Sequence, residues 1–180
     1  MLNLFGRSKP DPTSIVTERW ETKFFWKQRS RFREEQSESY EAVFEGRELV
    51  LRLKRENLFA WVNDPLYRYR DFVLEADLEL DPTGAHSSAG LIFRYVNEST
   101  YYYFLVSTRG YFRFDVVFNG NPMRLIDWTE LPLPASGDTS AIGPGEQTQG
   151  PQEFGLGHTH KLRVVANGSR FTLCCDEQWV

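Results

Sequence analysis

The sequence has few of the features that mark secreted or disulfide-stabilised proteins. Only two of its 180 residues are cysteine, and they are the neighbours Cys174 and Cys175. Neighbouring residues of a strand point to opposite faces, so these two are poorly placed to bridge each other. We therefore expect reduced thiols in a cytoplasmic protein whose stability comes from a packed core, which a chain of this length can form.

Long apolar runs and an excess of basic residues are also absent. The longest apolar run, residues 101–106, has six residues, against the roughly twenty that a membrane-spanning helix needs. Twenty-one basic residues stand against twenty-five acidic ones, a net charge of −4 that disfavours a dedicated nucleic-acid binder. No phosphate-cradling glycine loop, ordered Ser/His/Asp set or zinc-knuckle spacing occurs. We expect no membrane insertion, no nucleic-acid partner, no cofactor and no metal.

Alternating apolar and polar residues, the period of a half-buried strand, dominate from residue 49 onward. The clearest example is 72–80, where five apolar residues at spacing two alternate with Val73 and three acids. Further strands are predicted over 49–53, 89–96, 101–107, 111–118, 161–166 and 170–175. The dipeptide Asn119-Gly120 predicts a type I′ hairpin that returns the chain through 123–128. Short strands separated by turn residues indicate an all-β antiparallel sandwich or barrel.

The expected organisation is one domain with a polar extension. Residues 1–14 are predicted to form a flexible leader, and 15–180 a single β-sandwich. A Gly/Pro/Ser/Thr/Gln-rich stretch at about 134–157 is interpreted as a long exposed loop within it.

Several strand sequences resemble those of the concanavalin A-like jelly-roll sandwiches. The resemblance lies in residues 69–77 (YRDFVLEAD), 88–95 (SAGLIFRY), 101–104, 110–112 and 162–173. Within that class the chain is most similar to the laminin-G-like and keto-disaccharide hydrolase-like domains of bacteria, which typically bind carbohydrate or protein. The resemblance implies a jelly-roll β-sandwich. It also implies further strands after 176–178, so the last strands are expected to lie beyond Val180. The alternatives are that the N-terminal segment or a partner completes the fold.

Three acids at spacing two, Glu75, Asp77 and Glu79, resemble the catalytic strand of laminarinase-type glycosidases. That likeness implies Glu75 as nucleophile, Glu79 as acid/base and Asp77 as the group that tunes them. On a flat strand, however, the Cα atoms of Glu75 and Glu79 lie about 13 Å apart, whereas retaining enzymes need carboxyl groups within roughly 5.5 Å. A solvated outer face is the simpler interpretation, and catalysis by the three acids is the alternative.

A binding surface is the second interpretation of the same face. If the phenylalanines of the predicted strands point inward, alternation sends five polar residues outward: Glu75, Asp77, Arg94, Tyr103 and Arg113. On consecutive antiparallel strands they would form one ligand-binding patch, with planar charged groups for hydroxyls and an aromatic plate. A structural salt-bridge network between Arg94 and Glu75 or Asp77 is the competing hypothesis.

Two other groups of residues have the composition of a possible site. Residues 23–33 interleave basic and aromatic side chains, but glutamates follow directly, so a solvated edge is favoured over a membrane or nucleic-acid surface. His158 and His160 could form half of a metal site with His86 or the cysteine pair, but nothing in the spacing brings these residues together.

The sequence therefore predicts a non-catalytic jelly-roll module that binds a protein or a carbohydrate, with a protein favoured for a cytoplasmic chain. A glycoside hydrolase using Glu75, Asp77 and Glu79 is one alternative. The other is a structural piece of a larger scaffold, with further domains of the same chain beyond Val180.

Overall fold

The computed structural model describes residues 21–22, 24, 32–64, 68–81, 86–132 and 159–180. The predicted leader at 1–14, the predicted loop at 134–157 and most of the strip at 23–33 lie outside these residues. The chain divides into two compact units, Met1–Val62 and Asn63–Val180.

The first unit contains a three-stranded antiparallel sheet in the order β1-β2-β3. Its strands are β1 (Glu35–Gln36), β2 (Tyr40–Glu45) and β3 (Glu48–Leu53). Gly46 has a φ of 55° in the turn between β2 and β3, a conformation that glycine adopts without a Cβ penalty. The predicted strand at 49–53 is thus confirmed. This strand belongs to the first unit, whereas the prediction of a single sandwich over 15–180 included it in the sandwich.

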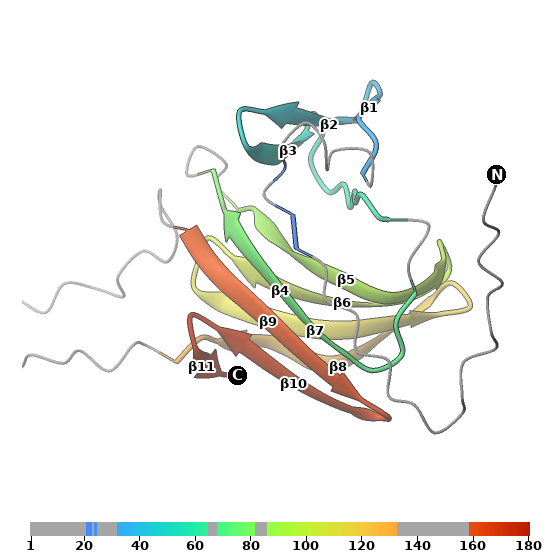
Figure 1. Ribbon diagram of the computed structural model, residues 1–180, viewed down its shortest axis with the longest axis vertical. Helices are drawn as coiled ribbons and strands as arrows, with labels where there is room; N and C mark the ends of the chain where they lie inside the picture. The colour runs from blue at the N-terminus through green and yellow to red at the C-terminus, as the bar shows by residue number, and fades with distance from the viewer. Residues whose placement is uncertain (1–20, 23, 25–31, 65–67, 82–85, 133–158) are drawn as a thin grey trace, which may run out of the picture. The chain divides into compact units, whose positions relative to one another are not determined.

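The second unit consists of two four-stranded antiparallel sheets, with the orders β11-β10-β9-β4 and β5-β6-β7-β8. The eight strands are β4 (Phe72–Glu79), β5 (Ser88–Asn97), β6 (Thr100–Ser107), β7 (Tyr111–Phe118), β8 (Asn121–Glu130), β9 (Thr159–Asn167), β10 (Arg170–Cys175) and β11 (Gln178–Trp179). Figure 1 shows the two sheets as stacked layers. The predicted fold class is confirmed as an all-β antiparallel sandwich, and no helix occurs in the described ranges.

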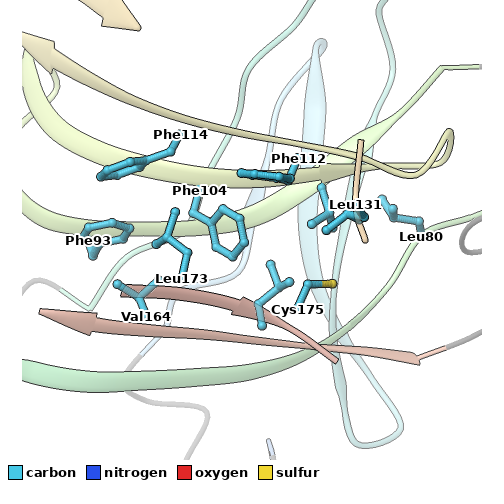
Figure 2. Close-up of a cluster of buried hydrophobic side chains, with 11 residues drawn as sticks. Leu80, Phe93, Phe104, Phe112, Phe114, Leu131, Val164, Leu173 and Cys175 are labelled. Carbon is cyan, nitrogen blue, oxygen red and sulfur yellow. The ribbon is translucent and has the colours of Figure 1, made fainter. Parts of the chain in front are cut away.

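Period-two patterning places the core between the sheets. Along β4 the half-buried side chains of Phe72, Leu74, Ala76 and Leu78 alternate with exposed ones. Inward-facing side chains of both sheets form one buried cluster (Figure 2): Leu80, Phe93, Phe104, Val106, Phe112, Phe114, Leu131, Leu162, Val164, Leu173 and Cys175. Burying this many large apolar side chains supplies the main favourable term in folding.

Turns and bulges set the direction of the outward side chains. Asn119 and Gly120 have φ values of 50° and 79° between β7 and β8, the two positive angles that a type I′ turn requires, so the predicted hairpin is confirmed. Register shifts occur between β5 and β6 after Phe93, and at two places between β7 and β8. Each shift changes which side chains meet across the strands.

Candidate functional site

A cluster of polar side chains lies on the outer face of the sheet β5-β6-β7-β8. Because Phe112 and Phe114 point into the core, alternation directs Arg113 and Asp115 of β7 outward. Tyr103 of β6 lies directly opposite Asp115 in the antiparallel register. We call the outward group the β7–β8 patch: Tyr103, Arg113, Asp115, Arg124, Asp127 and Trp128.

Asp115 is the centre of this patch. Its carboxylate is fully buried, and its Oδ2 atom accepts hydrogen bonds from Tyr103 Oη (2.5 Å) and Arg113 Nε (2.7 Å). Arg113 Nη2 donates to the same oxygen. The second oxygen, Oδ1, is buried without a hydrogen-bond partner among the described residues. A buried carboxylate is tolerated because the guanidinium pairs with it, and the pair fixes the position of Arg113.

A bulge brings an aromatic ring to the same place. Between the pairs Phe112–Thr129 and Phe114–Ile126, β7 has one residue, Arg113, while β8 has two, Asp127 and Trp128. The Arg113 guanidinium carbon lies 5.9 Å from the centroid of the Trp128 ring. This ring is 41% exposed. An exposed indole therefore lies beside a guanidinium that a buried carboxylate orients.

Two exposed charged side chains of β8 complete the patch. Arg124 Nη1 donates to Asp127 Oδ2 at 3.0 Å, and both side chains are largely exposed. The backbone N–H of Trp128 donates to Asp127 Oδ1 and lowers the pKa of that carboxyl. The patch thus offers an aromatic face, two guanidinium groups and one exposed carboxylate.

The protonation states of the inner group follow from its burial. Burial, followed by the hydrogen bond to Asp115, raises the pKa of Tyr103 to about 12. The hydrogen bond to Asp115 also raises the pKa of Arg113. At neutral pH Tyr103 is therefore a phenol that donates, and Arg113 is a cation.

The three candidate catalytic acids lie on the opposite face of the sandwich. Glu75, Asp77 and Glu79 are exposed on β4, which pairs with β9 without a register shift. Glu75 Oε1 accepts from Arg163 Nε at 2.5 Å, and Asp77 lies 4.0 Å from Lys161 Nζ. Without a bulge, Glu75 and Glu79 keep the roughly 13 Å Cα separation of a regular strand. The spacing of a retaining carboxylate pair is not formed on β4.

Arg94 does not lie in the outward ligand-binding patch that the sequence predicts. Its φ is 48°, at the register shift that follows Phe93. Its guanidinium donates to the carbonyl of Arg70 (3.1 and 2.8 Å) and to that of Gly168 (2.6 Å), and lies 3.7 Å from Asp71. The hypothetical network of Arg94 with Glu75 or Asp77 is therefore wrong. Those acids face β9 and pair with its basic residues.

Of the predicted ligand-binding residues, the structure brings only Tyr103 and Arg113 together. Glu75 and Asp77 lie on the other sheet, because β4 pairs with β9 and not with β5. The sequence alternation already placed Asp115 on the face of Arg113. Trp128 carried no such signal, because its place depends on the bulge between β7 and β8.

One group of potential metal ligands does come together. Atoms of His160, Cys175 and Asp176 that could ligate a metal ion lie within 4.8 Å of one another. His86 does not join them but contacts Arg109 Nη2 at 3.0 Å, and His158 lies outside the described residues. Burial, followed by the charge of Asp176, raises the pKa of Cys175 to about 12.

Comparison with known proteins gives few matches. No model of a protein family matches the chain. It is 29% identical, over 220 residues, to a TPR repeat-containing protein of Treponema pallidum (strain Nichols), an alignment that covers 94% of this chain and 24% of the relative. The chain thus spans about a quarter of the length of that relative. A solved structure, the carbohydrate-binding module CBM66 of Bacillus subtilis, is similar with a TM-score of 0.45 and 18% identity, over 62% of this chain and 57% of that one.

No helix in the described part of the chain is long and apolar enough to cross a membrane.

Proposed function

We propose that the second unit is a non-catalytic binding module of concanavalin A-like jelly-roll type and that its ligand contacts the β7–β8 patch. The observation that carries the proposal is the exposed Trp128 ring beside Arg113, whose guanidinium is fixed by the buried Asp115. A group held in this way loses little conformational freedom when a ligand binds, which favours affinity.

Two ligand classes suit the patch. A sugar ring stacks its apolar face on an indole, while guanidinium and carboxylate groups hydrogen-bond its hydroxyls. A protein partner would use the same residues, because Trp, Tyr and Arg are the side chains most often responsible for binding energy at protein interfaces. The curated relative is named for TPR repeats, which are pairs of helices. The described residues contain no helix, so the described part of this chain is not built from such repeats.

Binding rather than hydrolysis is supported by the geometry of the acids. A glycosidase would need two carboxyl groups facing one scissile bond. Glu75 on β4 is engaged with Arg163, and Glu79 lies about 13 Å along the same regular strand. Asp115 is buried against Arg113 and Tyr103, without an exposed oxygen for acid/base chemistry.

The experiment compares two exposed tryptophans of the sandwich. Trp128 belongs to the patch, whereas Trp179, which is 63% exposed, lies on β11 in the other sheet. The chain is screened on a glycan array and used in pull-downs, and every ligand found is titrated against Trp128→Ala and Trp179→Ala. Trp128→Ala should weaken binding at least about tenfold, as expected for an interface residue worth more than 1 kcal/mol. Trp179→Ala should bind as the wild type does.

If Trp179→Ala loses the ligand and Trp128→Ala keeps it, the binding surface is on the wrong sheet. If no glycan and no protein is bound, the chain is better described as a structural piece of a larger assembly.

A further inference from the structure

His160, Cys175 and Asp176 form a compact cluster at the open end of the β9–β10 hairpin, away from the β7–β8 patch. His160 Nδ1 lies 2.7 Å from Asp176 Oδ2, and Cys175 Sγ lies 3.8 Å from the same oxygen. The imidazole and the thiol are buried, whereas the Asp176 side chain is 45% exposed. The cluster therefore has an inner half in the core and an outer half in contact with solvent.

The fold holds these three side chains in place. His160 is buried on β9 at spacing two from Leu162, with the inward side chains. Cys175 lies opposite Leu162 in the β9–β10 register, and it is part of the buried cluster of Figure 2. Asp176 follows with a φ of 49°.

The carboxylate of Asp176 is fixed by the backbone. Its Oδ1 accepts the backbone N–H of Lys161 at 2.8 Å, and the backbone N–H of Asp176 donates to the Lys161 carbonyl at 2.9 Å. The carboxylate is thus turned back over the hairpin, with Oδ2 directed at the imidazole. Ligands prepositioned by backbone contacts cost little ordering entropy when they bind.

We propose that His160, Cys175 and Asp176 bind a divalent cation of the zinc class. One imidazole, one thiolate and one carboxylate are the ligand types that Zn²⁺ accepts, and three protein ligands plus water make an open tetrahedral site. Because the Asp176 side chain is exposed, a water ligand would enter the site from the side of this residue. In a tetrahedral zinc site the ligand atoms lie about 3.3–3.8 Å apart. The observed separations, from 2.7 to 4.8 Å, require shifts of about one ångström.

Binding exchanges one proton for the metal ion. Metal ions bind the thiolate, the neutral imidazole and the carboxylate, so the Cys175 thiol loses its proton to solvent when the cation binds. The two anionic ligands balance the charge of the cation, which allows it to lie next to the core. Proton release should therefore accompany binding.

The adjacent cysteine provides a matched control. Cys174 is buried on the opposite face of β10, where it pairs with Arg163 and Trp179. The full chain is titrated with Co²⁺, whose thiolate charge-transfer absorption reports a bound sulfur, and then with Zn²⁺. Wild type and Cys174→Ser should bind one equivalent with this absorption, and Zn²⁺ should displace it. In Cys175→Ser the absorption should be absent and the affinity should fall more than about 100-fold, since even outer-shell partners of a metal contribute 10- to 100-fold.

X-ray absorption of the wild type with one equivalent of Zn²⁺ is the second measurement, which needs no variant to fold. One sulfur ligand with nitrogen or oxygen ligands supports the site. No thiolate band at any Co²⁺ ratio, or zinc without a sulfur ligand, overturns it. A band that persists in Cys175→Ser and disappears in Cys174→Ser overturns it as well, and leaves the cluster a hydrogen-bonded structural group.

Discussion

Arg94 provides a sharp test of whether the sandwich is held as the structure indicates. From β5, its guanidinium reaches the carbonyls of Arg70, just before β4, and Gly168, in the turn between β9 and β10. It also lies 4.7 Å from the centroid of the Phe171 ring. One side chain of one sheet thus connects two segments of the other.

We expect Arg94→Ala to lower the free energy of unfolding of the second unit by about 2–4 kcal/mol. A hydrogen bond to a charged group contributes about 1.5–3 kcal/mol, and a cation–π contact about 0.5–1 kcal/mol at exposed sites. Two such hydrogen bonds and the cation–π contact would together give about 3.5–7 kcal/mol, and the estimate stays below that sum because part of the contact is reached by water. Arg94→Lys should recover little, because an ammonium cannot span two carbonyls as a planar guanidinium does.

Urea unfolding followed by circular dichroism and tryptophan fluorescence measures the effect. Arg70→Ala is the matched control, because Arg70 contributes its carbonyl to the contact and the substitution leaves that carbonyl in place. The control should lie within about 0.5 kcal/mol of wild type, as for an ordinary surface substitution. Arg94 and its partners all belong to Asn63–Val180, so any separate transition of the first unit should not move. If Arg94→Ala and Arg70→Ala unfold at the same urea concentration, the assigned bridging role is wrong.

Two further predictions concern the sheet β5-β6-β7-β8. At Gly90 an added Cβ would lie 1.9 Å from the carbonyl oxygen of Phe104, so Gly90→Ala should separate β5 from β6 and strongly lower the midpoint of thermal unfolding. Ser88→Ala on the same strand should leave that midpoint nearly unchanged. An unchanged midpoint for Gly90→Ala would mean that the β5–β6 register is wrong. The pKa of Tyr103 is raised to about 12 from an ordinary value near 10, so the unfolded chain loses this proton before the folded chain does. The contribution of Tyr103 to stability should therefore decline as the pH rises from about 10 to about 12. In an ultraviolet pH titration, Tyr103→Phe should remove a late-titrating tyrosine; if only an early-titrating one disappears, the Tyr103–Asp115 hydrogen bond is not formed.

Most strands of the second unit could be predicted from the sequence, whereas no strand was predicted for residues 35–45, where β1 and β2 lie. Alternation along 72–80 located β4 and its inward side chains, because a half-buried strand has to place apolar residues at spacing two. Asn119-Gly120 located the β7–β8 turn, because few other dipeptides adopt two positive φ angles easily. These are local rules, which depend only on residues that are neighbours in the chain.

The candidate site was predicted only in part, because it depends on contacts between distant strands. Tyr103 and Arg113 were on the right face, but Glu75 and Asp77 were assigned to the same patch on the assumption that β4 lies beside β5. In the structure β4 pairs with β9, almost ninety positions further along the chain. Strand order is a matter of long-range pairing and loop closure, for which alternation contains no information.

By itself, then, the sequence determined that the described part of this protein is all-β, which side of its main strands is buried, and where the β7–β8 turn lies, since those follow from side-chain period and backbone preference. Only the tertiary structure decided which strands are neighbours, that Trp128 joins Arg113 through a bulge, and that Cys175 meets His160 while Cys174 faces away. The physical reason is that a sheet face is built from several strands at once. Its composition is therefore fixed by strand order and register, and those are set by the packing of the whole core.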